Sequence, residues 1–293
     1  MFQFFANLFG YILAILYNLV NNYGLAIILF TVIIKLALLP MSIKQQRTMK
    51  KSAKLQEKMK ALQFKYKNDP EKLNQEMMNM YKEENMSPFS GCFTTIIQFI
   101  LLLSIFYLVR CPLTYMQKMP AEDLNKYASQ IKEEKTLSNA YPEIDIIREY
   151  NWLKEKNPED SNIEKTNLQM NFLGLDLSKI PQQNMNDYTV YIIPVLYIIS
   201  SFISIRMTTS MQEKQNKEKK ETVIDGETGK EEIKKDENEV DSIMQANKTM
   251  SWMMPIMSIS IAFVAPLGLA LYWLISNILM IGERLVLNKV IKD

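Results

Sequence analysis

The chain has no histidine and only two cysteines among its 293 residues. The lack of histidine excludes histidine-based acid–base catalysis and histidine ligands for a metal. Cys92 and Cys111 lie near the two ends of one apolar stretch, where a helix would hold them roughly 28 Å apart. Because no disulfide spans that distance, we expect both cysteines to be packing residues, and we expect no metal site.

The sequence also lacks the motifs of an enzyme. No glycine-rich phosphate loop follows a strand, and no acid–base pair lies within an apolar stretch. The net charge is only +2, from 34 basic and 32 acidic residues, so the chain as a whole is no general binder of polyanions. We therefore expect no enzyme, no cofactor and no direct nucleic-acid specificity.

Charge is almost absent from five stretches of helix length. On average the chain looks soluble, with 23% charged residues and a mean hydropathy of −0.09. Lys35, however, is the one charged residue within five apolar stretches, near 25–43, 90–109, 188–205, 250–265 and 268–282. This separation of apolar from charged residues argues against a soluble enzyme and predicts a multi-span membrane protein.

We expect an all-α polytopic membrane protein with five transmembrane helices, at 24–43, 89–110, 188–208, 249–265 and 268–287. Polar segments separate them at 44–88, 111–187 and 209–248, and a short tail follows at 288–293. Residues 42–88 and 209–248, together with Arg284 and the tail, hold 22 lysines and arginines, against nine in 111–187. Because basic loops tend to stay in the cytoplasm, we expect the N-terminus outside and the C-terminus inside.

The N-terminal segment 1–23 has a stripe of polar and small residues at three- and four-residue steps, made of Gln3, Asn7, Gly10, Ala14, Asn18 and Asn21. This spacing suits an amphipathic helix in the membrane interface, which ends between Asn21 and Gly24. The alternative is a further span, which would move only the N-terminus to the other side. No basic region or small-residue cleavage site is present, so we expect no secretory signal peptide.

Segment 44–88 carries a helical pattern of its own. Apolar residues recur at helical steps before and after a turn, as Leu55, Met59, Leu62 and Tyr66, then Leu73, Met77 and Met80. Asp69 is expected to cap the second helix and Pro70 to open it. We expect a cytoplasmic helical hairpin with a basic surface that includes Lys50, Lys51, Lys54, Lys58 and Lys60. The alternative is a solvated spacer, and the charged segment 209–248 is expected to be a flexible loop.

Lys35 is the most informative residue. It precedes Lys44 by nine positions, which is about 13 Å at helical rise. An intramembrane cation costs ~2.5–3.5 kcal/mol and normally faces a polar cavity or a partner; the alternative is snorkelling of its ammonium to the headgroups. Residues that could line such a cavity are Thr31, Gln98, Tyr272, Trp273, Ser276 and Asn277. Taken singly, each is better explained by helix–helix hydrogen bonding, and only the set around Lys35 favours a groove.

Four fragments, in this order, resemble one family. They are YGLAIILFTVIIKLALLPMSIKQQRTMKK from residue 23, LNQEMMNMYKEENMSPFSGCFTTIIQF from 73, NFLGLDLSK from 171 and MSWMMPIMSISIAFVAPLGLALYWLISN from 250. The first has its charged residue five positions before the proline, and the last is similar to the family pattern Pro-x-Gly-Leu-x-Leu-Tyr-Tyr/Trp. With its topology, the chain resembles the short, five-span bacterial members of the YidC/Oxa/Alb family of membrane protein insertases.

The resemblance implies a non-enzymatic insertase and chaperone that spans the bacterial cell membrane several times. It implies a hydrophilic groove in the inner leaflet, with its charge at Lys35 and further positions at Thr31, Gln98, Tyr272 and Trp273. Hairpin 44–88 matches a family hairpin that associates with incoming chains. The partners implied are nascent membrane proteins, the ribosome, the Sec translocon and the lipid bilayer.

Some features depart from the family pattern. Lys35 stands where bacterial relatives usually have arginine, so the charge is kept without the forked guanidinium. Prolines common in the second span are absent, as is the lipobox cysteine of Gram-positive relatives, and segment 111–187 is unusually long and suggests no known fold.

Two other functions stay open. A solute or ion transporter predicts inverted repeats or buried carboxylates, and a scaffold would hold partner helices without inserting them.

Overall fold

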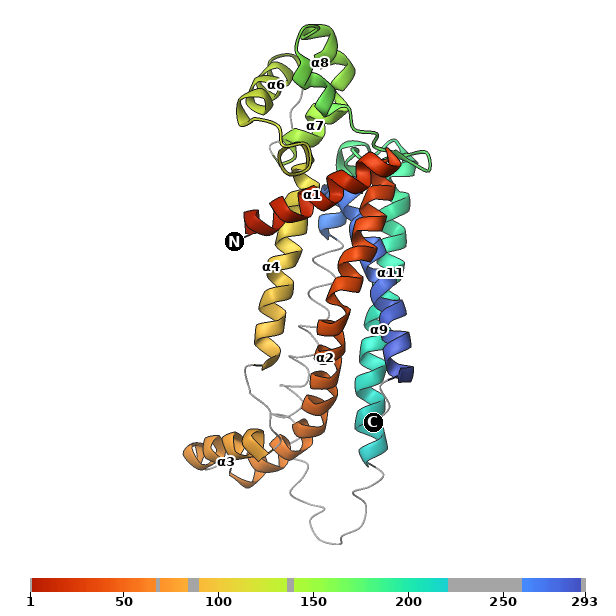
Figure 1. Cartoon of the computed structure of the whole chain (residues 1–293). Helices are drawn as coiled ribbons and strands as arrows, with labels where there is room; N and C mark the ends of the chain where they lie inside the picture. The colour runs from red at the N-terminus through yellow and green to blue at the C-terminus, as the bar shows by residue number, and fades with distance from the viewer. Residues whose placement is uncertain (1, 67–68, 84–89, 136–139, 221–259, 291–293) are drawn as a thin grey trace. The chain divides into compact units, whose positions relative to one another are not determined.

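The computed structural model describes residues 2–66, 69–83, 90–135, 140–220 and 260–290. The described chain is mostly helical (Figure 1). Its long helices are α1 (Phe2–Val20), α2 (Tyr23–Lys65), α3 (Pro70–Glu83), α4 (Ser90–Arg110), α6 (Ala121–Glu134), α9 (Ile192–Lys220) and α11 (Leu267–Val290). Shorter elements are α5 (Pro112–Tyr115), α7 (Pro142–Arg148), α8 (Tyr150–Lys156), η1 (Ser161–Thr166), β1 (Asn171–Phe172), β2 (Leu175–Asp176), η2 (Pro181–Gln183) and η3 (Tyr188–Tyr191).

Contacts divide the chain into two compact units. The first contains the described residues of Met1–Ala37, Gln98–Ser201 and Met257–Glu283. The second contains those of Leu38–Ile97, Phe202–Ile256 and Arg284–Asp293. Helices α2, α4, α9 and α11 each contribute residues to both units.

Four helices are long and apolar enough to cross a membrane. They are Phe2–Val20, Tyr23–Thr48, Tyr188–Met207 and Leu267–Leu287 among the described residues, with a shorter apolar helix at Phe99–Arg110. The last three of the four coincide with spans expected at 24–43, 188–208 and 268–287. Most of the span expected at 249–265 lies outside the described residues, as does most of segment 209–248; of that span, residues 260–264 are helical. The chain is thus a mostly helical membrane protein with four candidate spans.

The break between α1 and α2 has a local cause. Asn21 adopts a left-handed conformation with φ of 46°, which asparagine tolerates better than most residues. The side-chain oxygen of Asn22 then accepts a hydrogen bond from the backbone N–H of Leu25 at 3.0 Å and so caps the start of α2. The helix therefore ends where the sequence predicts.

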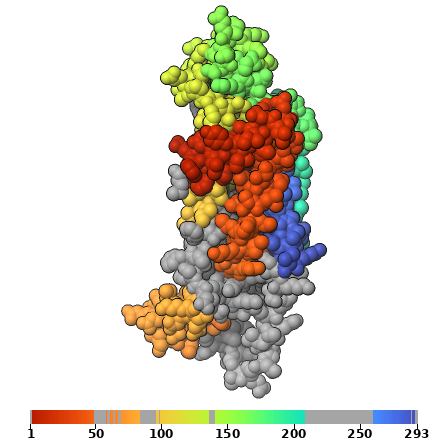
Figure 2. Space-filling view, viewed as in Figure 1, coloured from red at the N-terminus to blue at the C-terminus, as the bar shows by residue number. Residues whose placement is uncertain are grey.

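Helix α1 has three distinct faces. One face is buried in the first unit through Ala6, Phe9, Leu13 and Tyr17. A second is apolar and exposed, and consists of Phe4, Leu8, Tyr11, Ile15 and Leu19. The polar stripe supplies the third, on which Asn7, Asn18 and Asn21 are exposed. Figures 1 and 2 show α1 lying across the surface of this unit at a steep angle to the start of α2.

The docking of α1 depends on a glycine. Helix α1 packs against α5, and a Cβ atom added at Gly10 would lie 2.0 Å from the backbone oxygen of Tyr115. The two backbones therefore approach more closely than any other residue would allow. Nearby, the ammonium of Lys118 donates to the side-chain oxygen of Asn7 at 2.8 Å and lies 4.3 Å from the ring centre of Tyr11.

The second unit contains most of segment 44–88. Helix α2 continues through Pro40 to Lys65, so the first span and the first helix of the expected hairpin are one continuous helix. Helix α3 then begins at Pro70, and the Asp69 carboxylate accepts a hydrogen bond from the backbone N–H of Lys72 at 3.0 Å. The cap and the first residue of the second helix are therefore those expected from the sequence.

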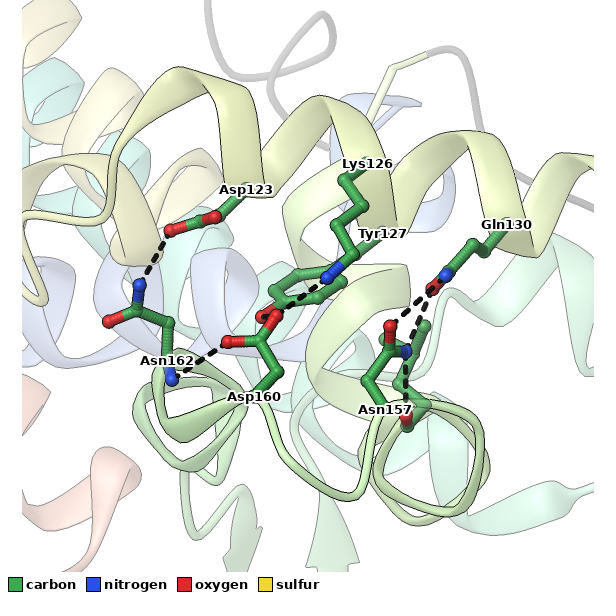
Figure 3. Close-up of polar contacts among 8 residues, drawn as sticks. Asp123, Lys126, Tyr127, Gln130, Asn157, Asp160 and Asn162 are labelled. Atoms are coloured by element: carbon green, nitrogen blue, oxygen red, sulfur yellow. Dashed lines mark hydrogen bonds and ion pairs between the residues drawn. The ribbon is translucent and has the colours of Figure 1, made fainter.

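Residues 121–135 and 140–168 form short helices that polar side chains hold together (Figure 3). Asp160 accepts from the ammonium of Lys126 at 2.7 Å and from the hydroxyl of Tyr127 at 2.9 Å. Gln130 and Asn157 exchange two hydrogen bonds, of 3.1 and 2.9 Å. These contacts join α6 to the residue that follows α8 and to the residues at the start of η1. Tyr127, Ile131, Leu153 and Ile163 are buried in the same part of the chain.

The expectation of an all-α chain is wrong in one detail. Strands β1 and β2 form a two-residue antiparallel hairpin, with Phe172 paired to Leu175. Its register leaves a two-residue turn in which Leu173 has φ of 51° and Gly174 has φ of 81°. Strands this short give too weak a period-two pattern to be recognised from the sequence.

Candidate functional site

The polar residues of α11 face α9 within the first unit. The side-chain amide of Asn277 donates to the hydroxyl oxygen of Ser201 at 2.8 Å and to that of Ser200 at 3.3 Å. One turn earlier, the ring of Trp273 packs against that of Tyr197, with centroids 5.9 Å apart. Asn277 therefore joins two apolar helices by hydrogen bonds, as expected for a single polar residue, and Trp273 joins them by ring packing.

Tyr272 and Ser276 form the neighbouring part of this surface. Tyr272 is 8% exposed and Ser276 is half-buried. Because the residues lie four apart on one helix, they occupy the same face. Helix α11 thus carries adjacent hydroxyl and amide groups in an otherwise apolar span.

Thr31 and Lys35 lie one turn apart on α2. Thr31 is 1% exposed and its hydroxyl donates to the backbone oxygen of Ile27 at 2.6 Å. Lys35 is half-buried, and Leu36 beside it is 63% exposed. Lys35 therefore stands at the border between the packed face of α2 and the side that faces away from the protein. Since the helix is continuous to Lys65, the spacing of about 13 Å to Lys44 holds.

The remaining predicted site residues are described only in part. The backbone of Gln98 is helical within α4, and its side chain lies outside the described residues. The same is true of Lys50, Lys51, Lys54 and Lys60 in α2. Lys58 is exposed on the same helix, which is consistent with the basic surface expected for the hairpin 44–88.

Sequence reasoning missed three buried serines of α9, of which Ser200 and Ser201 lie in the first unit and Ser204 in the second. Ser200, Ser201 and Ser204 are 4 to 7% exposed. In the second unit, the guanidinium of Arg284 lies 3.4 Å from the backbone oxygen of Ser204. The only sequence signal was their spacing, which places all three on one side of an apolar helix.

A buried carboxylate lies outside the candidate spans. Glu143 of α7 accepts hydrogen bonds from the backbone N–H of Thr114 at 3.0 Å and from its hydroxyl at 2.5 Å. Burial raises the pKa of Glu143, and the Thr114 hydrogen bonds oppose that shift. Burial, with the nearby Glu143 charge, also raises the pKa of the Cys111 thiol to about 12. Cys111 is therefore a protonated thiol at neutral pH and acts as a packing residue.

The polar groups of the described spans are hydrogen-bonding side chains and the half-buried side chain of Lys35. Within the described residues, no group of three histidine, cysteine, aspartate or glutamate side chains could hold a metal ion. The polar residues of α2, α9 and α11 supply hydroxyl, amide and ammonium groups that can bind water or polar parts of a peptide. This arrangement suits transient contact with a polar segment inside the bilayer.

Comparison with known proteins gives a family of membrane proteins. A family profile described as 60Kd inner membrane protein matches residues 15–293. Proteins named membrane protein insertase YidC are similar, including that of Chlorobaculum parvum, 27% identical over 94% of this chain and 34% of its own length. That of Treponema denticola is 27% identical over 96% of this chain and 37% of its own length. That of Clostridium tetani is 41% identical over 36% of this chain and 48% of its own length.

The family match covers nearly the whole chain, including the helices that carry Lys35, Ser201 and Asn277. The chain spans about a third of the length of the curated relatives that it matches over most of its own length. With its candidate spans and the family match, the chain belongs to the 60Kd inner membrane protein family, whose members are multi-pass proteins of the bacterial inner membrane.

Proposed function

We propose that this protein inserts nascent membrane proteins into the bilayer and assists their folding. Its family is non-enzymatic, which confirms the expectation that the chain is not an enzyme. The observation that carries the proposal is a half-buried ammonium, that of Lys35, one turn from the buried hydroxyl of Thr31 inside an apolar helix. An intramembrane cation normally faces a polar cavity or a partner, and we infer a polar cavity here.

The polar path is a hydrophilic groove that reaches partway into the bilayer. One part of its lining is Thr31 and Lys35 of α2, and another is the polar surface of Tyr272, Trp273, Ser276 and Asn277 on α11. Gln98 of α4 is proposed as a further lining residue. Water in this groove shortens the hydrocarbon path, about 30 Å in an ordinary bilayer, that a polar tail must cross.

The energetics need no nucleotide. Each acidic residue at the bilayer centre costs ~2.5–3.5 kcal/mol, whereas each large apolar residue of an inserted helix contributes about −0.3 to −0.6 kcal/mol. About twenty such residues therefore yield roughly −6 to −12 kcal/mol, which offsets the translocation of a short acidic tail. Lys35 lowers the barrier by attracting that tail, and the apolar helix then leaves sideways into lipid.

Topology and partners complete the proposal. Five spans place the N-terminus outside and the hairpin 44–88 in the cytoplasm, where its lysines meet incoming chains and the ribosome. Helix α1 lies in the outer interface, since its exposed apolar face and its polar stripe point in different directions. The protein acts alone or with the Sec translocon, and its other surface contacts are with lipid.

The test uses purified protein in vesicles with a single-span substrate whose translocated tail is acidic. At an effective dielectric of about 20, an ammonium and a carboxylate ~8 Å apart attract by about 2 kcal/mol, which corresponds to a rate change of about thirtyfold. We expect Lys35→Ala to slow insertion by about this factor, and Lys35→Arg to retain it. Protease protection of the tail measures insertion.

The matched control is Lys44→Ala, which removes an exposed lysine from the same helix, together with a substrate whose tail is neutral. Lys44→Ala should insert the acidic-tailed substrate at nearly the normal rate. Lys35→Ala should insert the neutral-tailed substrate at nearly the normal rate. Full activity of Lys35→Ala on acidic tails would refute the groove. Solute flux without insertion would favour a transporter, and substrate binding without insertion would favour a scaffold.

A further inference from the structure

Residues 169–191 connect the ends of three candidate spans. The backbone N–H of Tyr23, at the start of α2, donates to the oxygen of Gln169 at 3.0 Å. At the start of α11, the N–H of Leu267 donates to Lys179 and that of Gly268 to Leu177, both at 3.0 Å. The segment then continues through η3 directly into α9. Residues 169–191 therefore lie at the level where α2, α9 and α11 begin.

The hairpin in this segment presents an apolar side chain at its tip. Leu173 is 86% exposed and has a φ of 51°, a conformation that is unfavourable for leucine and natural for asparagine or glycine. The side-chain oxygen of Asn171 accepts from the N–H of Gly174 at 3.1 Å and stabilises the turn. A leucine at this position gains nothing from the protein itself, so the strain points to a contact outside it.

Two further apolar side chains are exposed in the same segment. Met185 is 66% exposed and Tyr188 is 85% exposed, and β2 packs against η3. The loop between them is ordered by Asp187, which forms an ion pair with Lys179 at 2.8 Å and accepts from the N–H and the hydroxyl of Thr189 at 3.0 and 2.6 Å.

The base of the hairpin is fixed against α2. A Cβ added at Gly24 would lie 2.5 Å from the ring of Phe172, so ring and helix are in tight contact. The side-chain amide of Asn22 also donates to the backbone oxygen of Asn171 at 2.7 Å. The tip is thus held in one position relative to the start of the span.

We propose that Leu173, Met185 and Tyr188 form an apolar foot that enters the headgroup region of the lipid leaflet on the side of segment 111–187. The occupant is lipid, because the segment is hydrogen-bonded to the ends of the spans and Tyr188 is the first residue of the candidate span Tyr188–Met207. Tyrosine is enriched at this depth. The foot holds the ends of α2, α9 and α11 at a fixed height in the membrane.

The test measures the depth of a fluorescent label. In a Cys92→Ser, Cys111→Ser background, a single cysteine replaces Leu173, Met185 or Tyr188. Each cysteine is labelled with the polarity-sensitive dye NBD. The labelled protein is then reconstituted alone into phosphatidylethanolamine–phosphatidylglycerol vesicles. We expect blue-shifted emission, quenching by lipids with a doxyl group near the headgroup, and at least threefold less quenching by iodide than at a cysteine replacing Glu155. Glu155 is an exposed residue of α8.

A second variant distinguishes loss of membrane contact from loss of the fold. Leu173→Asn suits the left-handed turn and removes the apolar tip, so it should raise thermal stability in detergent while increasing iodide quenching of a label at 188. Iodide quenching at 173 equal to that at 155 would overturn the proposal and leave the patch to a protein partner. Insertion of a substrate by the same vesicles is a separate readout, so failure of the foot is distinguishable from failure of the insertase function.

Discussion

Substitution of Gly10 by alanine tests how α1 is held. The added Cβ would lie 2.0 Å from the backbone oxygen of Tyr115, whereas ordinary contacts begin at 3.4 Å. Helix and carbonyl must therefore separate by about 1.4 Å, the difference between these distances. Because the obstacle is backbone and not a flexible side chain, α1 has to move as a body.

The magnitude follows from the packing that is lost. Overpacking of a tight contact costs ~1–3 kcal/mol, which exceeds the ~0.5–1 kcal/mol that alanine gains over glycine in a helix. For a chain of this length, each kcal/mol changes the melting temperature by about 2–4 °C. The net cost is therefore up to about 2.5 kcal/mol, and we expect Gly10→Ala to lower the melting temperature by up to roughly 10 °C.

Gly282→Ala is the matched control, since a Cβ there meets no atom within 4 Å. It should raise the melting temperature by roughly 1–4 °C. Thermal unfolding in detergent measures both variants, and limited trypsin digestion after Lys118, which contacts Asn7 of α1, reports local release of the helix. The close-approach argument fails if Gly10→Ala is as stable as Gly282→Ala and leaves cleavage at Lys118 unchanged.

Two further predictions concern polar contacts. Because burial raises the pKa of Glu143, the folded protein binds the proton more tightly than the unfolded chain, so stability should fall as pH rises from the usual value of 4.5 through the raised pKa. Glu143→Gln should flatten this dependence in unfolding measured against pH, and an unchanged slope would contradict it. For Asn277 and Ser201, a double-mutant cycle with Asn277→Ala and Ser201→Ala should give a coupling of ~0.6–1.7 kcal/mol in detergent-induced unfolding; additive effects would show that the bond contributes nothing.

Short-range features could be predicted from the sequence. The end of α1 at Asn21, the cap at Asp69 and the start of α3 at Pro70 depend on the conformation of one or two residues and on hydrogen bonds within one turn. The candidate spans near 24–43, 188–208 and 268–287 depend only on a long run of apolar side chains.

The use of each polar side chain could not be predicted in the same way. The sequence singles out Asn277 as a polar residue of an apolar helix, but it does not indicate that its amide donates to Ser200 and Ser201, which are 77 and 76 residues away in sequence. The fold of segment 121–168 depends on pairs such as Lys126 with Asp160 and Gln130 with Asn157. A sequence pattern does not indicate which distant residues become neighbours.

The sequence by itself determined that this chain is a helical membrane protein with a cation inside its first long span, because hydropathy and charge act along a single helix. Only the tertiary structure decided which faces pack together, that Gly10 meets the Tyr115 backbone, and that residues 169–191 form hydrogen bonds with the starts of α2 and α11. The physical reason is that burial and hydrogen-bond pairing depend on groups brought together from distant parts of the chain, whose positions are set by the whole fold.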